Sequence, residues 1–367
     1  MNKKTIITAL VALVAMSADA QRLNKDVERM QYVYALKEVI NDSVWSGFAD
    51  KQYDVPLLYY GDTCCYVVNP TEKFLAKYPS VLIHCDNNIQ IYQTEKVDDK
   101  PFHMHVTFTD EESNIDYHTP FMRCSSLEQT SKTIPDVTSV DEWATMVMHE
   151  YFHGFQFKND GYLETYETIT NTVLPDTLIA LAACHDWYRE SITQENDFLL
   201  KAIDANDIEA SRAYIQSFFK SRNERRERVK KKLGIDIVAL EQLYETMEGS
   251  ARYIEYCLYR HFGNFSLSDA KWLYTVGRKY YYATGFNLLR LSDKLEIDYK
   301  YGIFKDVSTV ERNLSITLSI SKMSVRNVAI PHSKYNHFFD IQEFDPIFFK
   351  KGICWNFKGG ADATSSR

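Results

Sequence analysis

The stretch MVMHEYFHGFQF, residues 146–157, is the most informative part of this sequence about its fold and its site. His149 and His153 lie four residues apart, so on a helix they share one face and lie one turn apart. Two imidazoles in that arrangement can bind one zinc ion. Glu150, next to the first histidine, can accept a proton from a water molecule at the open position of the metal. The stretch therefore predicts a metal centre with a general base beside it.

The residues before this stretch predict where its helix begins. Ser139 and Glu142 match a capping box, in which the serine is the N-cap and the glutamate is the third helical residue. We therefore expect a helix from Val140 to about Phe157, with the histidines on its third and fourth turns.

Zinc needs a third protein ligand and an open fourth position. The residue six positions after His153 is Asn159, so the third histidine of the pattern HExxHxxGxxH is missing. A better candidate is Glu248, and Glu255 lies two helical turns further on the same face, where it could accept a hydrogen bond from a ligand histidine. The alternative is an ordinary charged helix, because glutamate is common in helices.

Small residues next to Glu248 support the metal interpretation. Gly249, Ser250 and Ala251 follow it directly. We expect them to let this helix pack close to the helix that carries the two histidines.

Three motifs together resemble the gluzincin metallopeptidases, in particular the aminopeptidase N-like group. That group has HExxH, then NEGxxxYxE, then a tyrosine in a YxxG segment. This chain has HEYFH at 149–153, MEGSARYIE at 247–255 and YATG at 282–285. The resemblance implies a zincin-like catalytic region in which Glu248 is the third zinc ligand and Tyr282 stabilises the oxyanion. The chain also resembles uncharacterised secreted bacterial proteins of this superfamily.

The chain departs from the aminopeptidase pattern in three places. Glu248 follows His153 by 95 positions instead of about 18, Met247 replaces the asparagine, and no GxMEN segment is present. The resemblance therefore implies a gluzincin-type peptidase without aminopeptidase specificity. A phenol aimed at the developing oxyanion would lower the barrier to hydrolysis. Spacing alone does not choose among the consecutive tyrosines 280–282, and only the match to YxxG selects Tyr282.

The remaining sequence predicts an α+β fold with a sheet first and helices after it. We expect a helix over about 24–48, then β-branched and aromatic runs from Val55 to about Cys124 that form a mixed or antiparallel sheet. Helical patterns follow from about 139 to 295, including one helix over 176–192 and a short one over 268–274, and alternating segments near the end predict a small β-containing tail. The predicted units are a signal peptide at 1–20, a helix and sheet region at 21–138, a helical zinc-site region at 139–304 with a long insertion at 159–240, and a C-terminal segment at 305–367.

The first twenty residues have the pattern of a secretory signal. Lys3 and Lys4 precede a short apolar run, and Ala18-Asp19-Ala20 matches a cleavage site. No later apolar run is long enough to span a bilayer, so we expect export to the periplasm or the exterior without a membrane span.

Charge argues against nucleic acid as a partner. The formal net charge is −8 at pH 7, which is the wrong sign for an electrostatic footprint on phosphate. The one basic cluster, at 220–232, has interleaved glutamates, and we interpret it as a solvated helix face rather than a binding patch.

The sequence as a whole predicts a secreted metallopeptidase that uses one zinc ion and acts on a peptide or protein substrate. In this hypothesis His149, His153 and Glu248 bind the metal, Glu150 is the general base and Tyr282 stabilises the oxyanion. One alternative is a secreted non-catalytic binding or structural protein with a zinc-stabilised helical core, which the 95-residue gap motivates. Another is a zinc hydrolase of non-peptide amides or esters.

Overall fold

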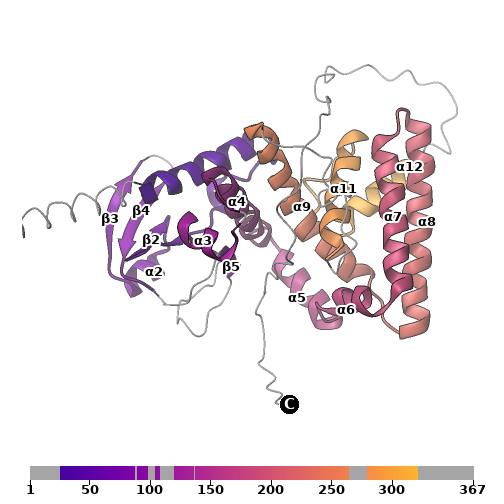
Figure 1. The fold of residues 1–367 in the computed structure, drawn as a ribbon, viewed down its shortest axis with the longest axis horizontal. Helices are drawn as coiled ribbons and strands as arrows, with labels where there is room; N and C mark the ends of the chain where they lie inside the picture. Colours follow the sequence, from indigo (N-terminus) through magenta and orange to yellow (C-terminus); the bar gives the residue numbers. More distant parts are fainter. Residues whose placement is uncertain are drawn as a thin grey trace, which may run out of the picture.

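The computed structural model describes residues 25–86, 89–97, 104–107, 120–135, 137–263 and 279–320. It has the α+β architecture that the sequence predicts, with a six-stranded sheet and many helices. The sheet lies at one end of an elongated molecule and the long helices lie at the other (Figure 1). Helices α4 (Val140–Phe157) and α9 (Val238–Phe262) pack against each other between the two ends.

The sheet is mixed, as expected. Its order is β3-β4-β2-β1-β6-β5, and β1 runs parallel to β6 while every other neighbouring pair is antiparallel. The strands are β1 (Leu57–Tyr60), β2 (Cys65–Val68), β3 (Ser80–Cys85), β4 (Gln90–Thr94), β5 (Met104–Thr107) and β6 (Phe121–Ser125).

Both faces of the central strands are buried, which explains why they read as continuous apolar runs. Successive strand residues point to opposite faces. Leu57 and Tyr59 therefore face the main core, while Leu58 and Tyr60 join a second apolar cluster with Phe74. Phe74 belongs to α2 (Glu72–Lys77), which covers that second face.

The first helix ends earlier than predicted, at residue 43 instead of about 48. The backbone N–H groups of Val44 and Trp45 both donate to the Ile40 carbonyl, which closes the helix. The Trp45 ring then turns into the core against Phe152 and Phe304. Burial of this large ring favours the turn over further helix. Helix α3 (Leu127–Thr133) and the short 3-10 helix Lys51–Tyr53 complete this end of the molecule.

The helical end is built around two long neighbouring helices, α7 (Asp186–Asp204) and α8 (Ile208–Leu233) (Figure 1). One continuous helix was expected over 176–192, but the chain breaks it at His185, whose backbone is extended. Leu181 before the break and Tyr188 after it are both buried, so the change of direction lets both side chains pack in the core. The helices are α5 (Tyr162–Thr172), α6 (Thr177–Cys184), α7 (Asp186–Asp204), α8 (Ile208–Leu233), α11 (Tyr281–Lys294) and α12 (Thr309–Ile320).

The solvated face predicted for the basic cluster at 220–232 is wrong for three of its arginines. Arg222, Arg225 and Arg226 are buried, whereas Lys220, Arg228 and residues 230–232 are exposed as expected. The buried arginines extend the apolar stripe of α8, and each is paired with carboxylates. A buried guanidinium is tolerated only with such partners.

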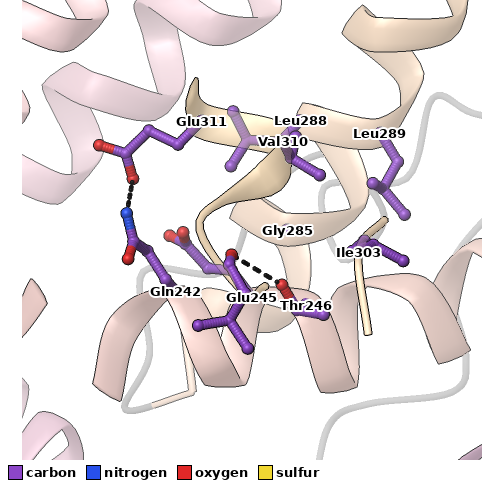
Figure 2. Close-up of a pocket in the computed structure, with 10 residues that line it drawn as sticks. Gln242, Glu245, Thr246, Gly285, Leu288, Leu289, Ile303, Val310 and Glu311 are labelled. Carbon is purple, nitrogen blue, oxygen red and sulfur yellow. Dashed lines mark hydrogen bonds between the residues drawn. The ribbon is translucent and has the colours of Figure 1, made fainter. Parts of the chain in front are cut away.

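Four carboxylates surround these three guanidiniums. Glu245 pairs with Arg222, Glu195 with Arg225 at 2.6 Å, and both Glu241 and Glu311 with Arg226 at 2.8 and 2.6 Å. Burial raises the pKa of Glu245 to about 7 although Arg222 opposes the shift. Glu245 therefore keeps its proton in mildly acidic solution. The other three carboxylates then balance the three guanidiniums, and the cluster has no net charge. A small cavity between α9, α11 and α12 borders this cluster (Figure 2).

The prediction of strands near the C-terminus is wrong where it can be compared. Residues 314–320 belong to α12, whose Val310 and Leu314 are one helical turn apart and both buried. Residues 321–367, the predicted helix at 268–274 and the predicted signal at 1–20 lie outside the described residues. Among the described helices, none combines the length and the apolar character needed to cross a membrane.

Candidate metal centre

Helix α4 begins where the sequence predicts and carries the two histidines inward. The Ser139 side chain accepts from the Glu142 backbone, and the Glu142 carboxylate accepts from the Ser139 backbone, so the capping box is confirmed. His149, Glu150 and His153 are 5%, 4% and 1% exposed. Their ligand atoms lie within 4.8 Å of one another, close enough to hold a metal ion.

Glu248 on α9 completes a triangle with the two imidazoles. Its Oε2 lies 3.6 Å from Nε2 of His149 and 3.5 Å from Nε2 of His153, and the two Nε2 atoms are 3.2 Å apart. Ligands of a tetrahedral zinc ion with bonds of about 2.0–2.1 Å are about 3.3 Å apart. Oε2 is buried and has no hydrogen-bond partner among the described residues. These three residues therefore fit a zinc ion.

The far nitrogen of each imidazole also has a partner. Nδ1 of His149 contacts Oε1 of Glu255, and Nδ1 of His153 lies 2.9 Å from Oε1 of Gln156. Acceptors at Nδ1 keep the proton there and leave the Nε2 lone pair free, which is the arrangement found around metal-binding histidines. The structure thus brings Glu255 to the position expected from its spacing.

The electrostatics of the site favour positive charge at its centre. Burial lowers the pKa of His149, but Glu255 and Glu248 overcome this and raise it to about 10. Burial alone would raise the pKa of Glu248, yet the two imidazoles hold it well below its usual range. Three carboxylates facing two imidazoles leave an excess of negative charge, which a divalent cation would neutralise.

Glu150 lies beside the triangle. Burial raises its pKa, against the attraction of the two neighbouring imidazoles. A carboxylate with a raised pKa is better suited to accept and return a proton near neutral pH.

Tyr282 is the one member of the tyrosine run that reaches the site. Its ring is stacked against that of His149, with centroids 6.4 Å apart and an interplanar angle of 13°. Burial raises its pKa, and so do the nearby carboxylates of Glu248 and Glu150. Tyr280 instead donates to Glu241, and Tyr281 packs on Tyr244, so the geometry now separates the three tyrosines.

Two glycines let α11 approach α9 closely. A Cβ on Gly249 would lie 2.5 Å from the backbone of Gly285, and a Cβ on Gly285 would lie 2.1 Å from the Glu245 carbonyl oxygen. The expectation that Gly249 packs against the histidine helix is therefore wrong, because it faces α11. Ser250 does face α4, where its hydroxyl meets Gln156. This crossing places Tyr282, one turn before Gly285, near Glu248.

Gln156 is a residue of the site whose role was not predicted from the sequence. It is fully buried on α4 and bridges His153 to α9. Its spacing three residues after His153 was a visible signal, because residues three apart on a helix are neighbours. Its partners on α9 were not visible in the sequence.

Comparison with protein-family models, curated proteins and solved structures finds no match to this chain. The site is accordingly defined by its own geometry, as a buried centre of two imidazoles and a glutamate with a second glutamate and a phenol beside it.

Proposed function

We propose that this chain is a zinc-dependent metallopeptidase of gluzincin type with a zincin-like catalytic region. One observation carries the proposal. Three ligand atoms from residues 95 positions apart in sequence converge with separations of 3.2–3.6 Å. Two histidines and a glutamate are a ligand set of catalytic zinc sites, which keep a fourth position open.

The chain's own residues suit amide hydrolysis. A bound zinc ion would polarise a substrate carbonyl and lower the pKa of water. Glu150 takes the proton of the attacking water and returns it to the leaving nitrogen. The Tyr282 hydroxyl donates to the carbonyl oxygen as negative charge develops there, which lowers the barrier.

The sheet offers a way to hold an extended substrate. Helix α4 packs against β5, which lies at the edge of the described sheet. An edge strand has backbone N–H and C=O groups that can pair with an extended peptide, so β5 supports an extended peptide as the substrate in preference to a compact molecule. Export through a signal peptide is part of the same proposal and follows from residues 1–20 alone.

The proposal is tested on the mature chain, from residue 21 onward. Mass spectrometry should find about one zinc per chain, lost in His149→Ala. Glu150→Ala should keep its zinc and lose cleavage of a diverse peptide library. Glu167→Ala, which removes an exposed carboxylate on α5, is the matched control and should cleave normally. Retained turnover by zinc-replete Glu150→Ala would refute the mechanism.

The burial of the site favours a second candidate, a non-catalytic protein stabilised by zinc. His153 and Glu248 are only 1% and 3% exposed. X-ray absorption separates the two functions, because a structural site has four protein ligands and a catalytic site keeps an exchangeable water. Hydrolysis of small amides or esters without peptide cleavage would instead select a non-peptide zinc hydrolase.

A further inference from the structure

Gln156 occupies a position where one side chain touches both halves of the metal centre. It is 0% exposed. Its Oε1 lies 2.9 Å from Nδ1 of His153, on its own helix. Its Nε2 lies 2.8 Å from the Met247 carbonyl oxygen and 2.9 Å from the Ser250 hydroxyl, both on α9. Both polar groups of the amide thus have protein partners, although the side chain is fully buried.

The direction of these hydrogen bonds is fixed. A backbone carbonyl only accepts, so the Gln156 NH₂ group must point at Met247 and its oxygen must point at His153. The Ser250 hydroxyl donates to the Thr246 carbonyl at 2.6 Å, so its oxygen is left to accept from Gln156. A flipped Gln156 amide would place its own Oε1 against the Met247 carbonyl oxygen, and neither oxygen can donate. Nδ1 of His153 must therefore carry the proton.

The consequence reaches the metal ligands on both helices. With the proton on Nδ1, the lone pair on Nε2 of His153 faces Oε2 of Glu248, 3.5 Å away. The Met247 carbonyl that anchors the amide belongs to the residue directly before Glu248. Because 95 positions separate the two ligands, the chain connection alone does not set the register of α9 on α4.

We propose that Gln156 is a positioning residue of the metal centre, which fixes the tautomer of His153 and holds α9 in the register that presents Glu248. This inference rests on the proposed zinc site. Partners that orient a ligand histidine typically change metal affinity 10- to 100-fold when they are removed. Gln156→Met keeps the length of the side chain and removes its hydrogen bonds, so it isolates this role.

The test measures zinc affinity of the mature chain by competition with a chromophoric chelator. Gln156→Met should bind zinc about 10- to 100-fold more weakly than the wild type. The d–d absorption bands of the cobalt-substituted variant should shift, because the imidazole changes its orientation. Asn196→Leu is the matched control. Among the described residues, this buried amide on α7 hydrogen-bonds to Ile192 and Thr284, neither of which is a proposed ligand, so its removal should leave both readouts unchanged.

A second measurement does not depend on whether the variant folds. A crystal structure of the zinc-loaded wild type should show His153 bound through Nε2 and Gln156 still joined to Met247. Ligation through Nδ1, or a Gln156 amide turned away from His153, would overturn the inference. Equal zinc affinity in Gln156→Met and wild type would also overturn it and leave the proposed function standing. Failure of the wild type to bind zinc would overturn both.

Discussion

Replacing Gly285 with alanine tests whether the close crossing of α9 and α11 is needed. The new Cβ would lie 2.1 Å from the Glu245 carbonyl oxygen and 2.8 Å from its Cα. Ordinary van der Waals contacts are 3.4–4 Å long, and the obstacle is backbone, so no side-chain rotation relieves it. Overpacking of this kind costs about 1–3 kcal/mol. Alanine regains about 1 kcal/mol of helix propensity over glycine. Because the clash is with backbone, we take the upper end of the overpacking range and expect the free energy of unfolding to fall by about 2 kcal/mol.

The matched control is Gly154→Ala, in the interior of α4. There the atoms nearest the new Cβ would belong to the Val55 side chain, at 3.0–3.5 Å, and not to backbone. Both variants gain the same helix propensity, so urea unfolding followed by circular dichroism should show Gly285→Ala less stable than Gly154→Ala by about 2–3 kcal/mol. Equal stability of the two variants would refute the claim that backbone contact at Gly285 sets the helix spacing.

Three further predictions concern individual groups. Tyr282→Phe should keep its zinc and lower kcat on a peptide substrate about 10²–10³-fold, as loss of an oxyanion donor does. Glu248→Gln should weaken zinc binding, measured by chelator competition, far more than Tyr282→Phe does, because it removes the charge from a ligand. The raised pKa of Glu245, about 7 against an ordinary 4.5, implies stability that is complete below pH 4.5 and lost as pH rises through 7. Urea unfolding of Glu245→Gln between pH 5 and 8 should lack this slope, which is at most about 1.4 kcal/mol per pH unit.

The parts of the site that follow local rules were predictable. A four-residue spacing places His149 and His153 on one face of a helix, and the Ser139 cap fixes where that helix begins. Seven residues likewise place Glu248 and Glu255 on one face. The meeting of the two faces was inferred from the small residues after Glu248 and from the resemblance, and the distances between their polar atoms support that inference.

The parts that depend on distant partners were not predictable. Gln156 was visible as a neighbour of His153, but its anchor at Met247 lies 91 residues away. The burial of the α8 arginines was not predicted, because charged side chains are usually exposed to solvent. Their positions at Arg222 and Arg225 continue the spacing of the buried Phe218, and that spacing was the available signal. In α12 an alternating pattern imitated a strand over a helix too short to show a clear period.

The long separation of the ligands has a consequence for the order in which the site is made. A chain grows from its N-terminus at about 5–20 residues per second. The two imidazoles of α4 are therefore synthesised several seconds before Glu248, and α5 to α8 lie between them in the chain. At the proposed zinc site, an ion that arrived before α9 docked would find two of the three protein ligands. If the site binds zinc as proposed, tight capture would therefore wait until α9 has docked on α4.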